Sequence, residues 1–296
     1  MKILLDTDIG CDIDDCLALP YLLAREDVEL LGITTVTGKP HLRAQLAKAV
    51  CDASGREIPI HVGLEEPISG AVRQTGLTST QSAVAEGCDT RYSEEETAIE
   101  FMRKTIEENP HEVTLLAIGP LTNVAALFSA YPHIPALLEG LAIMGGRYRD
   151  DPTFDTARWG KTEWNILCDT KAAEIVFSSC ACPCLVIGVE ETCRFSIPPK
   201  PLKDTLLGYP RWRPVSDAIN TVVERIFFHD VILAYALFHP EEVTTERGEI
   251  AVNTAEGGAT PFTPCKNGRF RIVTDYDPGR FFENYKKALD IEVAFN

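Results

Sequence analysis

The feature that most constrains the fold is an alternation between apolar, β-branched runs and segments with helical spacing. Residues 3–5 and 28–36 are expected to form buried strands, and residues 14–19 and 42–53 have the spacing of helices. Further strands are predicted at residues 59–63, 113–118 and 141–144. Strands that alternate with helices in this way form parallel βαβ units, so the sequence predicts an α/β fold. The 296 residues suffice for one large domain or two smaller ones.

Several segments carry weaker structural signals. Residues 65–93 are polar and show no clear period, so they are predicted to be a long loop. Residues 216–227 and 231–238 are predicted to be helices, and the tail from residue 246 is expected to cover an edge of the sheet. Pro20 falls inside the first predicted helix and is expected to shorten or bend it.

The charge balance argues against some classes of partner. The sequence has 28 basic and 44 acidic residues, which gives a formal charge of −16. Such a chain repels nucleic acid and anionic membrane surfaces, whereas a small neutral substrate, or one bound through a cation, is compatible with it. The N-terminus shows no leader pattern, and no apolar run approaches the ~20 residues of a membrane span. We therefore expect a cytoplasmic protein without nucleic-acid or membrane partners, whose ten cysteines are reduced.

Five carboxylates lie close together where the first predicted strand leads into the first helix: Asp6, Asp8, Asp12, Asp14 and Asp15. So many carboxylates at one turn would raise one another's pKa unless a cation compensates them. No histidine and no CxxC pair lies nearby, so the oxygen ligands favour Mg²⁺ or Ca²⁺ over Zn²⁺. The alternative is a solvated acidic loop in which Asp14 only caps the helix.

Two further groups of potential ligands occur later in the chain. A thiolate metal site is one interpretation of Cys180, Cys182 and Cys184. These cysteines lead into an apolar run, however, and lack a second ligand pair. Buried strand cysteines are the favoured interpretation. His229 and Asp230 combine a group that titrates near neutral pH with a hard ligand, although such a pair alone is more often structural.

Six short motifs follow one another along nearly the whole chain: DTDIG with a later DD at the start, ITTVTG at residues 33–38, AIGPLTN at 117–123, IMGG at 143–146, TEWN at 162–165 and HD at 229–230. These motifs resemble those of the inosine-uridine nucleoside hydrolases, which are calcium-dependent nucleoside N-ribohydrolases. The resemblance implies one domain over residues 1–296, with a mostly parallel central sheet and helices on both faces, in a Rossmann-like arrangement. It also implies a homodimer or homotetramer that hydrolyses ribonucleosides to ribose and free base in purine or pyrimidine salvage.

The resemblance also assigns roles to residues of the reaction centre. Asp8 resembles a metal-bound carboxylate that acts as general base. Asp15, Asp230 and the backbone carbonyl of Ile118 resemble the other Ca²⁺ ligands, and His229 resembles the residue that donates a proton to the departing base. Breaking a C1′–N bond passes through an oxocarbenium-like state, which such a set of charges would stabilise.

Other residues resemble those that hold the sugar. Asp14, Glu163 and Asn165 resemble groups that bind the ribose hydroxyls, and Met144 is expected to lie along the ribose. Asp6 resembles a residue that orients the others rather than a ligand.

The sequence departs from the family pattern near its start. Asp14 and Asp15 follow Asp8 by two residues more than is usual, so Asp12 is an alternative to either of them. Lys39 stands where the family usually has asparagine. Lys39 is expected either to bind a carboxylate or phosphate on the substrate or to point into solvent.

The third departure concerns base recognition. The segment after residue 63 lacks the pattern common in the family, so the residues that recognise the base do not transfer to this chain. Trp159, Tyr209 and Trp212 are candidates for stacking on a base, and core or surface packing is an equal alternative for each.

Three other functions stay open on sequence alone. An aspartyl phosphohydrolase is suggested by Asp6 and Asp8 after a strand, but it leaves the TEWN motif and His229 without a role. A catalytically silent nucleoside-binding protein of the same fold is the second alternative. The third is a ribohydrolase that acts on a modified or anionic riboside, for which Lys39 is the motivating residue.

Overall fold

The computed structural model describes residues 1–296 apart from residues 71, 89–95, 152–153, 221 and 296. Within the described residues, nine strands form one sheet in the order β10-β9-β11-β6-β5-β4-β1-β2-β3. Neighbours from β3 through to β11 pair in parallel, and β9 pairs antiparallel with both β11 and β10. The strands are β1 (Lys2–Thr7), β2 (Glu29–Thr35), β3 (Ile60–Val62), β4 (Val113–Ala117), β5 (Gly140–Met144), β6 (Cys184–Ile187), β9 (Val243–Ile250), β10 (Phe262–Pro264) and β11 (Phe270–Tyr276).

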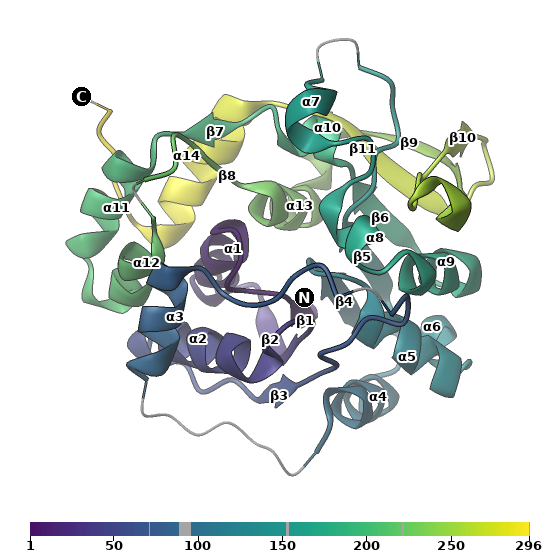
Figure 1. The fold of residues 1–296 in the computed structure, drawn as a ribbon, viewed down its shortest axis with the longest axis horizontal. Helices are drawn as coiled ribbons and strands as arrows, with labels where there is room; N and C mark the ends of the chain where they lie inside the picture. The colour runs from purple at the N-terminus through teal and green to yellow at the C-terminus, as the bar shows by residue number, and fades with distance from the viewer. Residues whose placement is uncertain (71, 89–95, 152–153, 221, 296) are drawn as a thin grey trace.

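Helices cover both faces of this sheet (Figure 1). Successive side chains of a strand point to opposite faces, so Ile3 and Leu5 pack into one apolar cluster and Leu4 packs into the other. The first cluster includes side chains of α1 (Asp14–Leu23), α2 (Pro40–Ala53), α3 (Ser79–Glu86), α11 (Pro199–Leu207), α12 (Arg213–Ala218), α13 (His229–Phe238) and α14 (Pro278–Leu289). The second includes side chains of α4 (Ala98–Glu108), α5 (Thr122–Ala130), α6 (Ile134–Leu137), α8 (Trp164–Cys168) and α9 (Thr170–Ser179). The predicted single-domain α/β fold with helices on both faces is confirmed.

Shorter elements complete the fold. β7 (Ser196–Ile197) and β8 (Ile226–Phe227) pair antiparallel in a second, small sheet. The remaining elements are α7 (Thr156–Trp159), α10 (Val189–Thr192), η1 (Pro210–Trp212), η2 (Pro240–Glu242) and η3 (Thr254–Glu256). None of the helices in the described part of the chain is long and apolar enough to cross a membrane.

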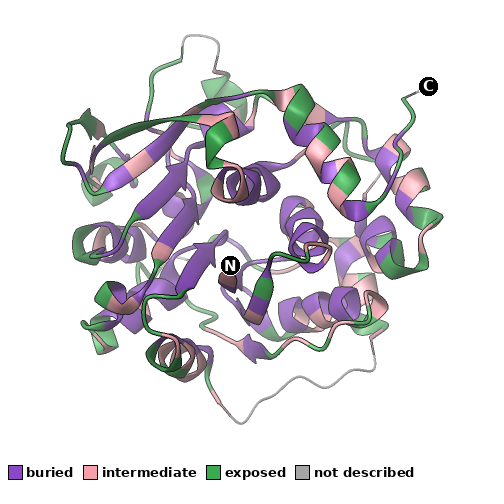
Figure 2. Cartoon of the chain, turned by 180° about the vertical axis from the view of Figure 1, so that it is seen from behind, coloured by how far each residue is buried: buried purple, intermediate pink, exposed green. Residues whose placement is uncertain are grey.

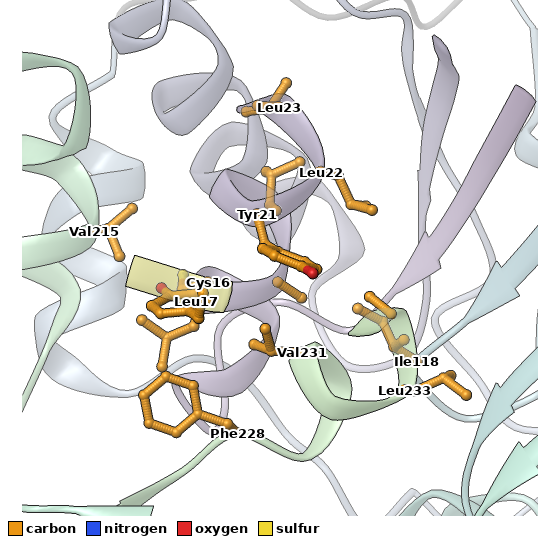
Figure 3. Close-up of a cluster of buried hydrophobic side chains, with 14 of the residues drawn as sticks. Cys16, Leu17, Tyr21, Leu22, Leu23, Ile118, Val215, Phe228, Val231 and Leu233 are labelled. Carbon is orange, nitrogen blue, oxygen red and sulfur yellow. The ribbon is translucent and has the colours of Figure 1, made fainter. Parts of the chain in front are cut away.

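Helix α1 is the central helix of the first cluster, and all its residues are buried. A helix that is apolar on all sides is stable only when it is enclosed, and Figure 3 shows Leu17 and Tyr21 of α1 within a cluster of buried side chains that includes Val231 of α13. In Figure 2, α1 and the central strands are coloured as buried, whereas the outer sides of the peripheral helices are exposed. The expected shortening at Pro20 is wrong, because α1 continues to Leu23.

Three of the predicted elements need correction. Residues 65–93 include α3, which has no hydrophobic period because its buried positions are Gln81 and Ala85; residues 71 and 89–93 lie outside the described residues. The predicted helix over residues 216–227 is wrong, since α12 ends at Ala218. There the Asn220 side chain accepts a hydrogen bond from Val222 N at 2.9 Å, a local turn that competes with a helix. The C-terminal tail does not merely cover an edge, because β11 lies inside the sheet between β9 and β6.

Candidate active site

The loops that leave the carboxyl ends of β1, β4 and β5 meet the N-termini of α1 and α13 around a cavity of about 80 Å³, called the acidic cavity below. Ligands of open α/β sheets bind at this edge. The cavity is lined by all the residues predicted to bind the metal or the sugar or to act in catalysis: Asp8, Asp12, Asp14, Asp15, Ile118, Met144, Glu163, Asn165, His229 and Asp230. Segments that are far apart in the sequence are thus brought together at one end of the sheet.

Asp14, Asp15 and Asp230 form a cluster of buried carboxylates. Each contributes an oxygen atom that lies within 4.8 Å of those of the other two. Burial raises the pKa of each carboxyl well above its usual range, and the neighbouring carboxylates raise it further. Asp230 Oδ1 is buried without a hydrogen-bond partner among the described residues. A cation would satisfy this atom and offset the repulsion, and a set of oxygen ligands suits a hard divalent ion.

Asp8 lines the same cavity and is held by two residues from later segments. Its Oδ2 accepts a hydrogen bond from Gln74 Nε2 at 2.6 Å, and its backbone carbonyl accepts one from the buried guanidinium of Arg43. Burial raises the pKa of the Asp8 carboxyl, and the positive charge of Arg43 counteracts this rise. Arg43 also donates to the carbonyls of Ile9 at 3.1 Å and Thr37 at 2.7 Å, so it joins the loop after β1 to the loop after β2.

Glu163 and Asn165 lie on another wall of the acidic cavity, at the start of α8. Glu163 caps this helix and accepts hydrogen bonds from the backbone N–H groups of Asn165 at 2.8 Å and of Ile166 and Gly146 at 3.0 Å. Burial raises the pKa of Glu163 to about 7, although these three donors favour the carboxylate. Asn165 Nδ2 donates to the Ile118 carbonyl at 2.8 Å. A carbonyl oxygen has two lone pairs, so Ile118 keeps one for a further partner.

His229 is the first residue of α13 and lies between a polar and an aromatic neighbour. Its Nδ1 lies 2.6 Å from Thr192 Oγ1. The ring of Phe227 is stacked on the imidazole at a centroid distance of 5.5 Å and an interplanar angle of 12°. Burial lowers the pKa of His229 to about 4, so the imidazole is neutral at neutral pH when nothing else is bound.

Asp6 does not line the cavity. The Asp6 side chain is fully buried, and its Oδ1 accepts hydrogen bonds from Thr34 Oγ1 at 2.6 Å and Asn123 Nδ2 at 2.8 Å. Asn123 also donates to the Thr35 carbonyl at 3.0 Å. Asp6 therefore links β1 to β2 and α5, and its orienting role stays a prediction.

Sequence reasoning missed several residues that shape the site. Arg43 carried a weak signal, because it occupies the buried face of the helix predicted at residues 42–53. Gln74 lies in a segment without a hydrophobic period, and Thr192 lies in a short helix that was not predicted. Nothing in the sequence around either residue therefore indicated a role in the site. All three act through contacts between segments distant in the sequence.

Several other candidates lie outside the acidic cavity. Lys39 is exposed at the start of α2 and does not line it. Trp212 is buried, and its Nε1 donates to the Leu289 carbonyl at 3.3 Å, so this indole packs in the core. Tyr209 is partly buried against the same core cluster. Trp159, in contrast to these three residues, lines the acidic cavity.

Two other groups of potential metal ligands are also remote from this cavity. Cys180, Cys182 and Cys184 are buried, and the Sγ atoms of Cys180 and Cys182 lie 4.0 Å apart, too far for a disulfide bond. No metal-ligand group of three found within the described residues includes them. His239 and its neighbours Glu241 and Glu242 do form such a group, but they follow the far end of α13 from the acidic cavity.

The fold and the acidic cavity together define an α/β protein with a cluster of buried carboxylates that could hold a metal ion at the carboxyl ends of its parallel strands. Residues 3–283 match the family model described as "Inosine-uridine preferring nucleoside hydrolase". The chain therefore belongs to this family, and it is an enzyme of the nucleoside N-ribohydrolase type, which hydrolyses glycosyl bonds.

Similar proteins differ in the base that their names specify. The chain is 28% identical over 274 residues to uridine nucleosidase 1 of Arabidopsis thaliana, a match that covers 86% of this chain and 78% of the relative. It is 27% identical over 283 residues to the pyrimidine-specific ribonucleoside hydrolase RihB of Escherichia coli strain SE11, with 89% and 87% covered. The structure of a purine-preferring ribonucleoside hydrolase from Gardnerella vaginalis superposes with a TM-score of 0.80 at 23% identity, covering 98% of each chain, and this similarity shows the fold.

Proposed function

We propose that this enzyme hydrolyses the N-glycosidic bond of ribonucleosides to ribose and free base with Ca²⁺ held by Asp8, Asp15, Asp230 and the Ile118 carbonyl. The observation that carries this proposal is the buried carboxylate cluster beside Asp8, with one carboxylate oxygen left without a partner among the described residues. The mixture of carboxylates and a backbone carbonyl suits Ca²⁺ better than Mg²⁺, which requires stricter octahedral geometry. When bound, the ion supplies positive charge that orients the ribose diol and lowers the pKa of a water molecule.

The residues of the acidic cavity have different roles in the proposed reaction. Asp8 accepts the proton of the water that attacks C1′, and the hydrogen bond from Gln74 to its Oδ2 holds the carboxylate in place. Asp14, Glu163 and Asn165 bind the ribose hydroxyls, while Met144 lies along the sugar. The negative charge that these carboxylates place near the ribose stabilises the oxocarbenium-like state.

His229 is proposed as the acid that assists the departing base. Its lowered pKa means that the free enzyme carries a neutral imidazole at neutral pH. Negative charge that develops on the base in the transition state favours the protonated imidazole and so opposes the effect of burial. Phe227 and Thr192 hold the ring in one orientation from two sides.

The experiment that tests this function is the release of ribose and free base from a panel of purine and pyrimidine ribonucleosides, in Ca²⁺ and after chelation. We expect release from at least one nucleoside that stops on chelation and returns when Ca²⁺ is restored. Tight binding of the same nucleosides without turnover would contradict the proposal and identify a silent binding protein. Lys39 lies outside the acidic cavity, so its position gives no support to an anionic riboside.

Several broader properties are proposed on the family resemblance. We propose that residues 1–296 form one nucleoside hydrolase domain, that the enzyme is a homodimer or homotetramer, and that it acts in the cytoplasm in purine or pyrimidine salvage. Light scattering of the purified protein tests the oligomeric state, and a monomer in solution would contradict it.

A further inference from the structure

A second cavity of about 340 Å³ adjoins the acidic cavity and is called the aromatic cavity below. The two cavities share Cys11, Asp12, Asp14, Trp159 and His229. The aromatic cavity therefore lies where the base would extend from a ribose bound in the acidic cavity.

The aromatic cavity takes its name from two rings beside His229. Trp159 meets Phe227 edge-on at a centroid distance of 4.8 Å and an interplanar angle of 89°, and it meets His229 edge-on at 5.5 Å and 83°. Phe227 belongs to β8 and Trp159 to α7, so elements from separate parts of the chain form this wall. Flat rings at right angles to one another suit a flat heterocycle.

Arg158 places a permanent positive charge in this cavity. Its guanidinium carbon lies 5.2 Å from the ring centroid of Trp159 and also 5.2 Å from that of Phe227. The Arg158 side chain is exposed, and the structure shows no ion pair for it among the described residues. Arg225 lines the same cavity, but its guanidinium is hydrogen-bonded to Ser196, with Nε 2.6 Å from Ser196 Oγ. Arg158 is thus an available donor in a chain whose formal charge is −16.

We propose that Arg158 contacts the departing base and stabilises the negative charge that develops on it when the C1′–N bond breaks. This inference rests on the proposed function, because it assumes that the ribose is bound in the acidic cavity. An arginine keeps its charge at any physiological pH and offers several N–H donors in one plane. It is therefore suited to a base anion whose charge is spread over ring nitrogen and carbonyl oxygen.

The step balances without any further reactant. The oxygen of water forms a bond to C1′ while Asp8 takes one of its protons. The C1′–N bond breaks, and both of its electrons go to the ring nitrogen of the base. The guanidinium of Arg158 donates hydrogen bonds to the resulting anion, and the base takes up a proton, from His229 or from water, before or after it leaves the cavity.

The test compares leaving groups that differ in their need for stabilisation. The substrates are inosine, uridine and 4-nitrophenyl β-D-ribofuranoside, whose nitrophenolate is already a stable anion. With Ca²⁺ present, Arg158→Gln is expected to lower kcat for both nucleosides by about 100-fold, the scale found when one charge-stabilising donor is removed. KM is expected to change by less than about threefold, because the charge appears only in the transition state. The nitrophenyl riboside is expected to lose less than about threefold in kcat, because its leaving group gains little from a donor.

Two further variants make the comparison selective. Arg158→Lys keeps the charge and is expected to recover part of the lost rate. Arg211→Gln is the control, since Arg211 is also exposed, its guanidinium carbon lies 5.1 Å from the ring centroid of Trp212, and it lines neither cavity. It is expected to behave as the wild type on all three substrates.

Either of two results with Arg158→Gln would overturn the inference. The first is nucleoside turnover within about threefold of the wild type. The second is an equal loss on all three substrates, which would indicate that Arg158 only supports the local structure. If the wild type cleaves none of the three substrates in Ca²⁺, both the proposed function and this inference are wrong. This result is distinct from the two results with Arg158→Gln.

Discussion

The acidic and aromatic cavities meet at His229, yet they are built in different ways. The acidic cavity is formed mainly by buried side chains at strand ends and helix starts, and Asp8, Asp14, Asp15 and Asp230 are each no more than 7% exposed. The aromatic cavity is formed by the four-residue helix α7, by the segment before α13, where Val223 is 44% exposed, and by residues of the loop before α1, of α3 and of α12. On the proposed roles, the residues of the reaction lie mainly on rigid elements, whereas the base is recognised partly by exposed segments that tolerate change.

The largest effect is expected from Asp8→Ala, which removes the proposed general base and Ca²⁺ ligand from the acidic cavity. We expect kcat for nucleosides to fall by about 10⁴-fold, the upper end for loss of a general base, together with weaker Ca²⁺ binding. Ribose release at saturating Ca²⁺ measures the first effect. Asp204→Ala on the exposed side of α11 is the control. Full turnover with unchanged Ca²⁺ affinity in Asp8→Ala would contradict the mechanism.

His229→Ala tests the boundary between the two cavities. We expect Ca²⁺ to bind as in the wild type, because the imidazole is not a proposed ligand. Nucleoside turnover is expected to fall by about 100-fold, the lower end for loss of acid assistance. Turnover of 4-nitrophenyl riboside should change little. Loss of Ca²⁺ binding in this variant would contradict the assignment of metal binding to the carboxylates and of acid assistance to His229.

Trp159→Ala acts on the aromatic cavity. Stacking of a base on an aromatic ring is worth about 1–3 kcal/mol, so KM for nucleosides is expected to rise by about tenfold. Steady-state kinetics measure this rise, and Trp159→Phe should retain most of the affinity. An unchanged KM in Trp159→Ala would place the base elsewhere.

The smallest effect is expected from Lys39→Ala. Lys39 is exposed and lines neither cavity, and surface substitutions usually change free energies by less than about 0.5 kcal/mol. Kinetic constants for nucleosides should therefore stay within about twofold. A larger loss, confined to anionic ribosides, would revive a role for Lys39 in substrate binding.

The same contrast explains how much could be predicted from sequence. The strand ends carry local signals: an apolar run followed by carboxylates marks β1 and Asp8, and His229-Asp230 stands at the start of an apolar helix. Because parallel strands end at one edge, these signals suffice to bring the predicted residues together, as the lining of the acidic cavity shows.

The aromatic cavity and its supports lacked such signals. The prediction of one helix over residues 216–227 left no place for β8 and Phe227. The composition there favours a helix, but the chain instead forms a hydrogen bond to the Asn220 side chain. Gln81 occupies a buried position of α3, where an apolar residue would be expected. Its Nε2 donates to the carbonyls of Cys11 at 3.1 Å and Asp12 at 3.0 Å. Contacts of this kind depend on tertiary structure, which periodicity does not reveal.

The most direct test of the account is a calorimetric titration of Ca²⁺ into metal-free protein, carried out with the wild type and with Asp230→Asn. The carboxylate cluster predicts one Ca²⁺ site per chain in the wild type and a large loss of affinity in the variant, since Asp230 Oδ1 is a buried oxygen of this cluster without a protein partner among the described residues. No binding to the wild type, or equal binding to both proteins, would contradict the assignment of the acidic cavity as the metal site.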